Sequence, residues 1–272
     1  MTIDYRLPGA LTDLVAVPSG LLEGLGTEPV DICAPVHALV IQPGDAEARD
    51  FPEDRLGENQ IRPAADLVVL LQGLESRSLA ESREPLHRVV GTCRHFAVLA
   101  CALLRYRGIA ARVRCGFATY FERDRAVDHW IVEYRAIDTH RWVRLDPEIL
   151  GQKVVGNPDD LVAGQFLSGG EAWMAYRRGA IDASRFGVHG TANWGPAEIR
   201  GNVVKDLAAL NKVEMLPWDE WGRMTEAYDG ATGPDYDALL DEIAEVCATD
   251  DTIAVASLYE HADLRVPDEL VR

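Results

Sequence analysis

The clearest hydrophobic pattern in the chain lies between residues 92 and 107. Four apolar residues recur there at the spacing of one helical face: Phe96, Leu99, Leu103 and Leu104. This spacing is typical of an amphipathic helix. Thr92 is suited to cap its first turn, Arg105 complements the dipole near its end, and Gly108 supplies a left-handed stop. The pattern therefore predicts a helix that begins directly after Thr92.

The segment after Gly108 changes from a helical period to an alternating one. Apolar side chains occupy every second position, at Ala111, Val113, Cys115 and Phe117. This period predicts a strand. Two more strand-like runs follow, at 129–134 and 142–146, so we expect one helix followed by an antiparallel meander.

The flanks are less strongly patterned. Residues 1 to about 60 are punctuated by Pro and Gly, and 61–74 reads as a helix. From about residue 157 the chain is mainly helical, with Pro196 placed as the first residue of one helix and further helices expected at 235–248 and 252–260. We expect an α+β fold, with a catalytic core in 1–155 and a mainly helical extension in 156–272. The extension can belong to the same domain.

Composition narrows the possible functions. The 272 residues include 27 Lys and Arg against 44 Asp and Glu, a formal charge of −17, and 47% are hydrophobic. A globular enzyme fits these values, whereas a nucleic-acid surface needs clustered basic residues. The acidity has two readings, general solubility or attraction of a cationic or amine substrate. Composition does not choose between them.

The spacing of the cysteines and the first residues of the chain indicate the cellular compartment. Five widely spaced cysteines, without a Cys-x-x-Cys pair, indicate neither a disulfide framework nor a thiolate zinc site. The first residues lack the basic and apolar regions of a signal peptide, and the longest apolar run, 96–104, is too short to cross a membrane. We expect a cytoplasmic protein with no membrane partner.

Cys93 is the candidate nucleophile because it lies at the start of the predicted helix. Backbone N–H groups and the partial positive charge of a helix N-terminus favour a thiolate over a thiol. The same N–H groups can hold the oxyanion of a tetrahedral intermediate. A cysteine in this position is also compatible with ordinary packing, so the prediction depends on its partners.

His129 and Asp146 supply the base and the acceptor that orients it. If Ile137 and Asp138 form the tip of a hairpin, opposed residue numbers sum to 275 and His129 faces Asp146. Opposed side chains in an antiparallel pair lie roughly 5 Å apart, and an even shift of register keeps them on one face. The alternative is that His129 is a core histidine and that Asp146 only begins a turn with Pro147.

Five blocks of sequence carry a family resemblance. They are Gly91-Thr92-Cys93-Arg94-His95-Phe96-Ala97, Ala102-Leu103-Leu104-Arg105, Gly108-Ile109-Ala110-Ala111-Arg112, Asp128-His129-Trp130-Ile131-Val132-Glu133 and Trp142-Val143-Arg144-Leu145-Asp146-Pro147. In order and spacing they resemble the cysteine, histidine and aspartate elements of bacterial transglutaminase-like proteins. The resemblance covers about residues 87 to 147.

The resemblance implies a papain-like core, with the nucleophile helix packed on an antiparallel sheet and an acyl-enzyme at Cys93. His95 departs from it, because many relatives carry an acid there. We interpret it as a neutral variation on the first turn of the helix; the alternative is that a cation at this position further favours the thiolate. Candidates for a side-chain oxyanion donor or substrate contact are Gln72, His87 and Trp130. Trp130 can alternatively shield the His129 ion pair from water, or simply pack.

The leading hypothesis is hydrolysis of an amide or peptide bond, by an amidase or peptidase. One alternative is an amide-forming acyltransferase that uses an amine and an amide or carrier-tethered thioester. A second alternative is a noncatalytic binding scaffold. No cofactor or metal is expected, since no Asp-x-Asp-x-Asp-Gly calcium loop is present. The expected partner is a peptide, amide or thioester substrate, and not nucleic acid.

Overall fold

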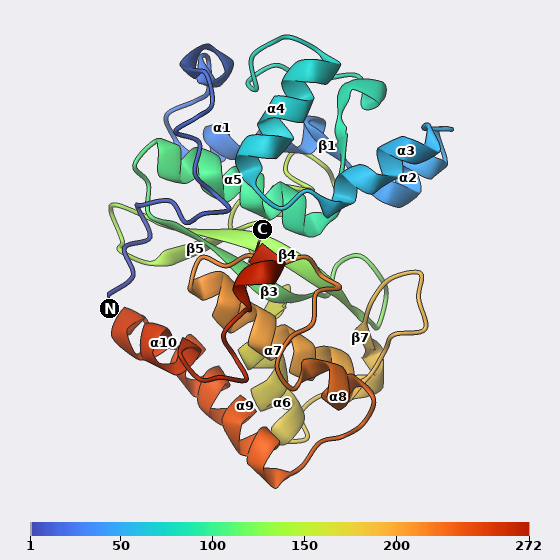
Figure 1. Ribbon diagram of the computed structural model, residues 1–272, viewed down its shortest axis with the longest axis vertical. Coiled ribbons are helices and arrows are strands. Elements are labelled where there is room, and N and C mark those ends of the chain that lie inside the picture. The colour runs from blue at the N-terminus through green and yellow to red at the C-terminus, as the bar shows by residue number, and fades with distance from the viewer. Residues whose placement is uncertain (1, 272) are drawn as a thin grey trace. The chain divides into compact units, whose positions relative to one another are not determined.

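The computed structural model describes residues 2–271 (Figure 1), and the chain divides into two compact units. We call them the cysteine unit and the histidine unit, after Cys93 and His129. The cysteine unit comprises Asp4–Val113 and Ile131–Leu161. The histidine unit comprises Met1–Ile3, Arg114–Trp130 and Val162–Arg272. Each unit is built from segments that are distant in the sequence, and the expected division at residue 155 stays a prediction.

The helices are distributed over both units. In chain order they are α1 (Pro29–Cys33), α2 (Pro43–Glu47), α3 (Glu53–Leu56), α4 (Ala64–Leu74), α5 (Cys93–Tyr106), α6 (Gly169–Arg177), α7 (Pro196–Leu210), α8 (Met224–Tyr228), α9 (Pro234–Cys247), α10 (Thr252–Tyr259) and α11 (Asp268–Val271). Short 3-10 turns lie at Ser19–Leu22, Val36–Ala38, Gly57–Gln60, Pro85–His87 and Ala183–Arg185. In the described part of the chain, no helix is long and apolar enough to cross a membrane.

The strands form two sheets. They are β1 (Val40–Ile41), β2 (Val89–Val90), β3 (Ala111–Ala118), β4 (Ala126–Arg135), β5 (Trp142–Leu145), β6 (Phe166–Ser168) and β7 (Phe186–Gly187). β1 and β2 pair in parallel, while the larger sheet has the order β5-β4-β3-β6, with β7 alongside β4. The pairs β4–β5 and β3–β6 are antiparallel. The fold is α+β, as the sequence pattern predicts.

Helix α5 confirms the strongest pattern in the sequence. It begins at Cys93, has Thr92 as its N-cap, and ends before Arg107. Gly108 follows with φ of 75°, the left-handed conformation expected of a helix stop. Every residue from Cys93 to Arg105 is buried, so the helix is enclosed on all sides rather than on one face. Near its end, Nε of Arg105 donates to the carbonyl of Ala111 at 3.0 Å, which ties the helix to the start of β3.

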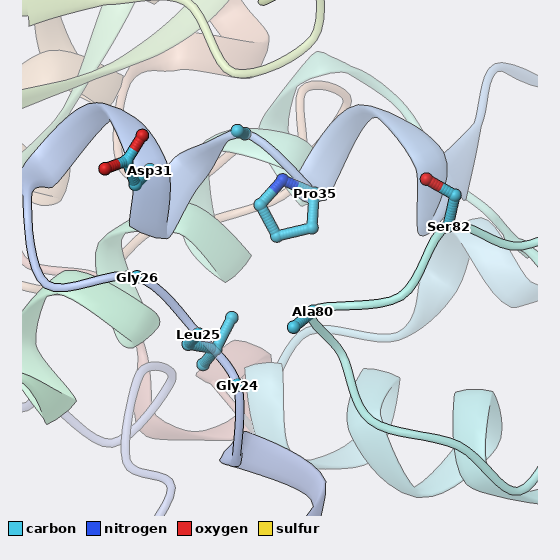
Figure 2. A pocket seen from close by; sticks show the side chains of 8 residues that line it. Gly24, Leu25, Gly26, Asp31, Pro35, Ala80 and Ser82 are labelled. Atoms are coloured by element: carbon cyan, nitrogen blue, oxygen red, sulfur yellow. The ribbon is translucent and has the colours of Figure 1, made fainter.

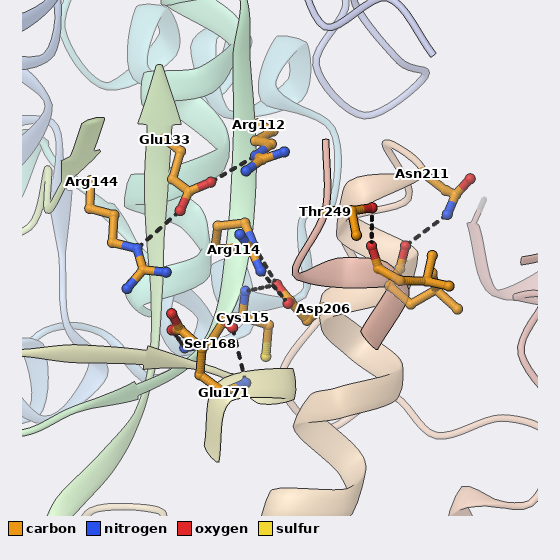
Figure 3. Close-up of polar contacts among 12 residues, drawn as sticks. Arg112, Arg114, Cys115, Glu133, Arg144, Ser168, Glu171, Asp206, Asn211 and Thr249 are labelled. Atoms are coloured by element: carbon orange, nitrogen blue, oxygen red, sulfur yellow. Dashed lines mark hydrogen bonds and ion pairs between the residues drawn. The ribbon is translucent and has the colours of Figure 1, made fainter. Parts of the chain in front are cut away.

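The buried arginines of β3 are balanced by carboxylates within each unit (Figure 3). In the cysteine unit, Glu133 accepts from Arg112 at 2.7 Å and from Arg144 at 3.1 Å. In the histidine unit, Arg114 donates two bonds to Asp206, at 2.9 and 2.8 Å. Burial of an unpaired charge would be costly, and these bonds are what allow arginine to alternate with apolar residues in a fully enclosed strand.

The β4–β5 hairpin has a different register from the expected one. Val132 pairs with Leu145 and Arg135 with Trp142, so opposed numbers sum to 277 rather than 275. The tip is a four-residue loop, 137–140, closed by a bond from the amide of Ala136 to the carbonyl of Arg141, and not the two-residue turn Ile137-Asp138. His140 takes φ of 53° to close it. The shift of two residues changes the opposite partners but leaves each strand's faces unchanged.

The helical part of the histidine unit is organised around α7. Pro196 is its first residue, as predicted, and α6, α8, α9 and α10 all contact it (Figure 1). Helices α9 and α10 agree with the expected segments 235–248 and 252–260. Trp173 is fully buried and its indole N–H donates to Asp241 at 2.8 Å. This tryptophan packs in the helical core.

Candidate active site

Cys93 occupies the first position of α5, in the cysteine unit. As a whole residue Cys93 remains slightly accessible, at 8%, whereas the other four cysteines are 0 to 3% exposed. No disulfide joins any two of the five cysteines. Burial raises the pKa of the Cys33 thiol well above its ordinary value, which suppresses its thiolate. Position and accessibility therefore distinguish Cys93 from the other cysteines.

His95 holds the first turn of this helix in place. Its Nδ1 accepts the backbone N–H of Thr92 at 3.0 Å, and its Nε2 lies 3.0 Å from the carbonyl of Ile61. This arrangement uses the neutral ring with hydrogen on Nε2, in the role that Glu or Gln plays in a capping box. Burial, together with nearby Arg94, lowers the pKa of His95 to about 3. The idea that a cation at His95 favours the thiolate is thus wrong, because the imidazole is neutral at physiological pH.

The peptide before the helix depends on a glycine. A Cβ at Gly91 would lie 2.8 Å from the Cβ of His95 and 3.1 Å from a methyl group of Val40. The amide of Gly91 donates to the carbonyl of Ile41, which continues the β1–β2 pairing up to the helix. The missing side chain lets the nucleophile turn lie directly against β1 and the capping histidine.

Asp146 directly follows β5 in the same unit and is fully buried. Its Oδ1 accepts the amide of Glu148 at 3.0 Å, and its own amide donates to the carbonyl of Pro158 at 2.8 Å. Asp146 therefore does begin a turn with Pro147. These two bonds fix both the backbone and the carboxylate plane, which is what an orienting acceptor requires.

Gln42 is a further side-chain amide in the cysteine unit. It follows β1, whose partner β2 leads through Gly91 into α5, and its Nε2 donates to Glu148 at 2.8 Å. It is linked in this way to the turn that holds Asp146. The sequence offers only a weak signal for this residue, the apolar pair Val40-Ile41 before it, because the parallel pairing joins segments almost fifty residues apart.

His129 lies in β4, in the histidine unit, and is only 2% exposed. Its imidazole packs edge-on against Phe121, with ring centroids 4.9 Å apart, and against Tyr120 at 6.2 Å. Both aromatic residues come just after β3. They restrict the imidazole's rotation, and the only signal for them in the sequence is an aromatic pair at a strand end.

The three candidates for an oxyanion donor or a substrate contact have interactions of their own, which do not involve Cys93, His129 or Asp146. Gln72 donates to Ser76 at 2.8 Å on α4, and His87 lies 3.3 Å from Glu75. Trp130 is fully buried, and its indole nitrogen has no hydrogen-bond partner among the described residues. Strand alternation directs Trp130 to the opposite face of β4 from His129. These surroundings leave Gln72, His87 and Trp130 outside the proposed site.

Within 2–271, no group of three His, Cys, Asp or Glu side chains could hold a metal ion. A cavity of about 270 Å³ in the cysteine unit is lined by small residues and by Asp31 and Ser82 (Figure 2). None of the predicted site residues is among those that line it.

Part of the chain is similar to a known protein family. Residues 75–147 match the model of the Transglutaminase-like superfamily. The matched segment contains Cys93, His129 and Asp146, and the match supports the resemblance of this segment to a transglutaminase-like domain. Such domains are generally enzymatic and use cysteine-dependent acyl chemistry. A search of curated proteins found no match.

Proposed function

We propose that the protein is a cysteine-dependent hydrolase of an amide or peptide bond, with Cys93 as nucleophile, His129 as base and Asp146 as the group that orients the imidazole. One observation carries the proposal: within the transglutaminase-like segment, Cys93 begins a rigid buried helix and is the most accessible of the five cysteines. A structural cysteine has no need of that position.

In the first half-reaction, His129 takes the proton of the Cys93 thiol, and sulfur attacks the carbonyl carbon. The carbonyl oxygen becomes an oxyanion, which the amides of the first turn of α5 stabilise. Collapse of this intermediate breaks the carbon–nitrogen bond. His129 returns the proton to the leaving amine, and a thioester to Cys93 remains.

In the second half-reaction, a water or an amine attacks the thioester and gives its proton to His129. Water yields a carboxylic acid, whereas an amine yields a new amide, and both restore the thiol. Asp146 accepts the hydrogen of the other imidazole nitrogen throughout and holds the required tautomer. Hydrolysis is the leading proposal because it needs no site for a second substrate.

The two outcomes can be separated by product analysis. The assay follows acid and amide formation from an amide or thioester substrate while the amine concentration rises. We expect acid as the main product, with its rate independent of the amine. An amide that replaces the acid in proportion to the amine would assign the protein as an acyltransferase. No turnover of amide or thioester libraries, without any acyl-enzyme by mass spectrometry, would instead favour the binding scaffold.

Variants of the triad test the individual roles. Cys93→Ser should abolish measurable turnover, and Asp146→Asn should lower kcat by about 10³-fold or more while leaving KM nearly unchanged. Cys101→Ser serves as a matched control, because this thiol lies two turns further along the same helix and is fully buried. Loss of turnover in the control to the same extent would mean that the helix, rather than the Cys93 sulfur, determines the result.

We also propose a reducing compartment such as the cytoplasm, and the cysteines support this proposal. All five cysteines are unpaired with one another in the structure. A catalytic thiol also stays active longest where disulfides do not persist. Localisation of a tagged full-length protein by fractionation tests this, and recovery in an oxidising compartment with disulfides formed would contradict it.

A further inference from the structure

Two aromatic residues lie against the imidazole that the proposed reaction uses as its base. Phe121 and Tyr120 pack edge-on against His129, with ring centroids 4.9 and 6.2 Å from that of the imidazole. The two rings also contact each other, at 4.8 Å between centroids and with 54° between their planes. Both residues are partly exposed, whereas His129 is only 2% exposed. An apolar surface that solvent still reaches therefore lies directly beside the base.

The segment that carries these rings is anchored at both ends within the histidine unit. Where it leaves β3, the amide of Thr119 donates to the carbonyl of Gln165 at 3.0 Å, and the hydroxyl of Thr119 donates to the carbonyl of Gly164 at 2.8 Å. The segment turns at Asp124, which has φ of 61°. It then enters β4 at Ala126, which pairs with β7. These contacts hold the two rings in place beside the imidazole.

Charged side chains of the same segment pair with one another and with the segment after β7. The carboxylate of Glu122 accepts from His189 at 2.5 Å and from Arg125 at 3.3 Å. The Arg125 guanidinium also lies 4.3 Å from the ring centroid of Trp194. The charges of Glu122 and Arg125 are thus balanced by groups of the same unit. A ring surface with locally balanced charges favours an apolar group over a charged one.

The proposed reaction determines which part of a substrate lies beside His129. The imidazole returns a proton to the leaving nitrogen, so one of its nitrogens must come within about 2.6–3.2 Å of that atom. In a peptide, this nitrogen belongs to the residue after the scissile bond, and the side chain of that residue begins two bonds away from it. That side chain therefore lies close to the imidazole, at the distance where Phe121 and Tyr120 also lie.

We propose that Phe121 and Tyr120 form an aromatic wall for the leaving residue of a peptide substrate, and that the protein prefers peptide bonds followed by an aromatic or large aliphatic residue. The inference rests on the proposed hydrolase function and adds a substrate class to it. Contact with the aromatic wall buries apolar surface of the leaving residue, and ring–ring contact adds to this when that residue is aromatic. A carboxylate in the same position would lose hydration against the rings.

A peptide library tests this preference on the full chain. Peptides from a digested proteome are incubated with the wild type, and mass spectrometry identifies the new N-termini, with Cys93→Ala as the background. We expect aromatic and large aliphatic residues at the new N-termini at least about threefold above their abundance in the library, and aspartate and glutamate below theirs. Hydrolysis of acyl methyl thioesters, whose leaving group has no side chain, is measured in parallel.

These two measurements separate the aromatic wall from the function on which it rests. Peptide cleavage without the enrichment would overturn the inference and leave the hydrolase proposal intact. Thioester hydrolysis without any peptide cleavage would have the same meaning, because the aromatic wall requires a peptide substrate. Neither peptide cleavage nor thioester hydrolysis by the wild type would overturn the hydrolase proposal, and this inference with it.

Variants assign the preference to the two rings. A cleaved peptide is prepared with phenylalanine or with alanine after the scissile bond, and the ratio of the two kcat/KM values should be at least about tenfold in the wild type. Phe121→Ala should lower this ratio to less than about threefold, whereas Phe121→Leu keeps an apolar side chain and should retain most of it. A disturbed His129 slows both peptides alike, so the ratio reports the aromatic wall alone.

Tyr106→Ala is the matched control for these variants. It removes an exposed aromatic side chain at the far end of α5 and should leave the ratio unchanged. A ratio that is unchanged in both Phe121→Ala and Tyr120→Ala, or that falls equally in Tyr106→Ala, would overturn the proposal.

Discussion

The imidazole Nδ1 of His95 accepts the backbone N–H of Thr92 at 3.0 Å, so the helix that presents Cys93 is capped by a neutral histidine. Its Nε2 bonds to the backbone carbonyl of Ile61, and the guanidinium of Arg94 donates to the backbone carbonyl of Arg62 at 2.7 Å. The first turn of α5 is thereby attached to the segment that leads into α4. Rigidity of this turn is what a nucleophile and an oxyanion site require.

His95 should make the protein sensitive to acid. Its folded-state pKa is about 3, below the ordinary 6.5, so the unfolded chain takes up the proton first as pH falls. Stability is complete above pH 6.5 and is lost progressively toward pH 3. Between about pH 6.5 and 4.5 the loss from this group is on the order of 2 kcal/mol.

Urea unfolding of the wild type and His95→Gln over this range measures the effect. Glutamine can cap the helix without titrating. We expect the stability difference between the two proteins to narrow, or to reverse, as pH falls. A difference that is constant with pH would show that His95 does not titrate in this way.

Gly91→Ala should disturb the nucleophile turn. The added Cβ would meet His95 at 2.8 Å, so the cap or the β1 contact must shift, at a cost of about 1–3 kcal/mol. Gly44→Ala is the control, because nothing lies within 4 Å of its added Cβ. Thermal unfolding should show a lower Tm for Gly91→Ala and little change for Gly44→Ala. Equal Tm values would contradict the close approach.

Loss of the carboxylate of Asp206 should strongly destabilise the protein. Asp206 is fully buried, pairs with Arg114 through two bonds, and also accepts the amide of Cys115 at 3.1 Å. Asp206→Ala removes the carboxylate that balances the buried Arg114 guanidinium and should cost about 3–5 kcal/mol. Asp160→Ala removes the exposed partner of Arg141 and should cost at most about 1 kcal/mol. Chemical denaturation measures both variants, and a similar loss of unfolding free energy in the two would contradict the difference between the buried and the exposed ion pair.

Glu198 should act on stability in the opposite direction from His95. Its pKa is raised to about 7 by burial and by Asp128 and Glu220, against the effects of Lys205 and Tyr228. The unfolded chain therefore loses this proton first as pH rises, and stability declines from about pH 4.5 through pH 7.

Glu198→Gln removes this decline, so the variant should gain on the order of 2 kcal/mol relative to the wild type between pH 4.5 and 7. Chemical denaturation at a series of pH values measures the difference. A gain that does not grow with pH would mean that Glu198 keeps an ordinary carboxyl pKa.

The sequence pattern predicted the elements whose signals are local. Helix α5 was predictable because an apolar period is bounded by Thr92 and Gly108, and Pro196 marks the start of α7 in the same manner. The register of the β4–β5 hairpin was not predictable, since it depends on the left-handed conformation of His140 in a four-residue loop. Strand alternation alone carries no information about loop length.

The candidate site was predictable only in part. Cys93 at a helix start and Asp146 directly after a strand follow from local patterns and from the family resemblance, whereas His129 lies inside β4, which begins at Ala126 rather than at residue 129. The link between Gln42 and the turn of Asp146 could not be predicted from the sequence. It depends on the two-residue parallel pairing of β1 with β2, which joins segments that are distant in the chain. The sequence pattern does not predict the burial of Glu198 on α7 either, because a polar residue in a helix pattern is ordinarily expected to face solvent.

The central claim is that Cys93 is the activated nucleophile, and differential alkylation tests it most directly. The native protein is treated with a limiting amount of iodoacetamide near neutral pH, and peptide mass spectrometry follows each of the five thiols. We expect Cys93 to react fastest, and His129→Ala to slow its reaction while leaving the other cysteines unchanged. Alkylation of Cys93 no faster than the other four, or unaffected by His129→Ala, would contradict the claim.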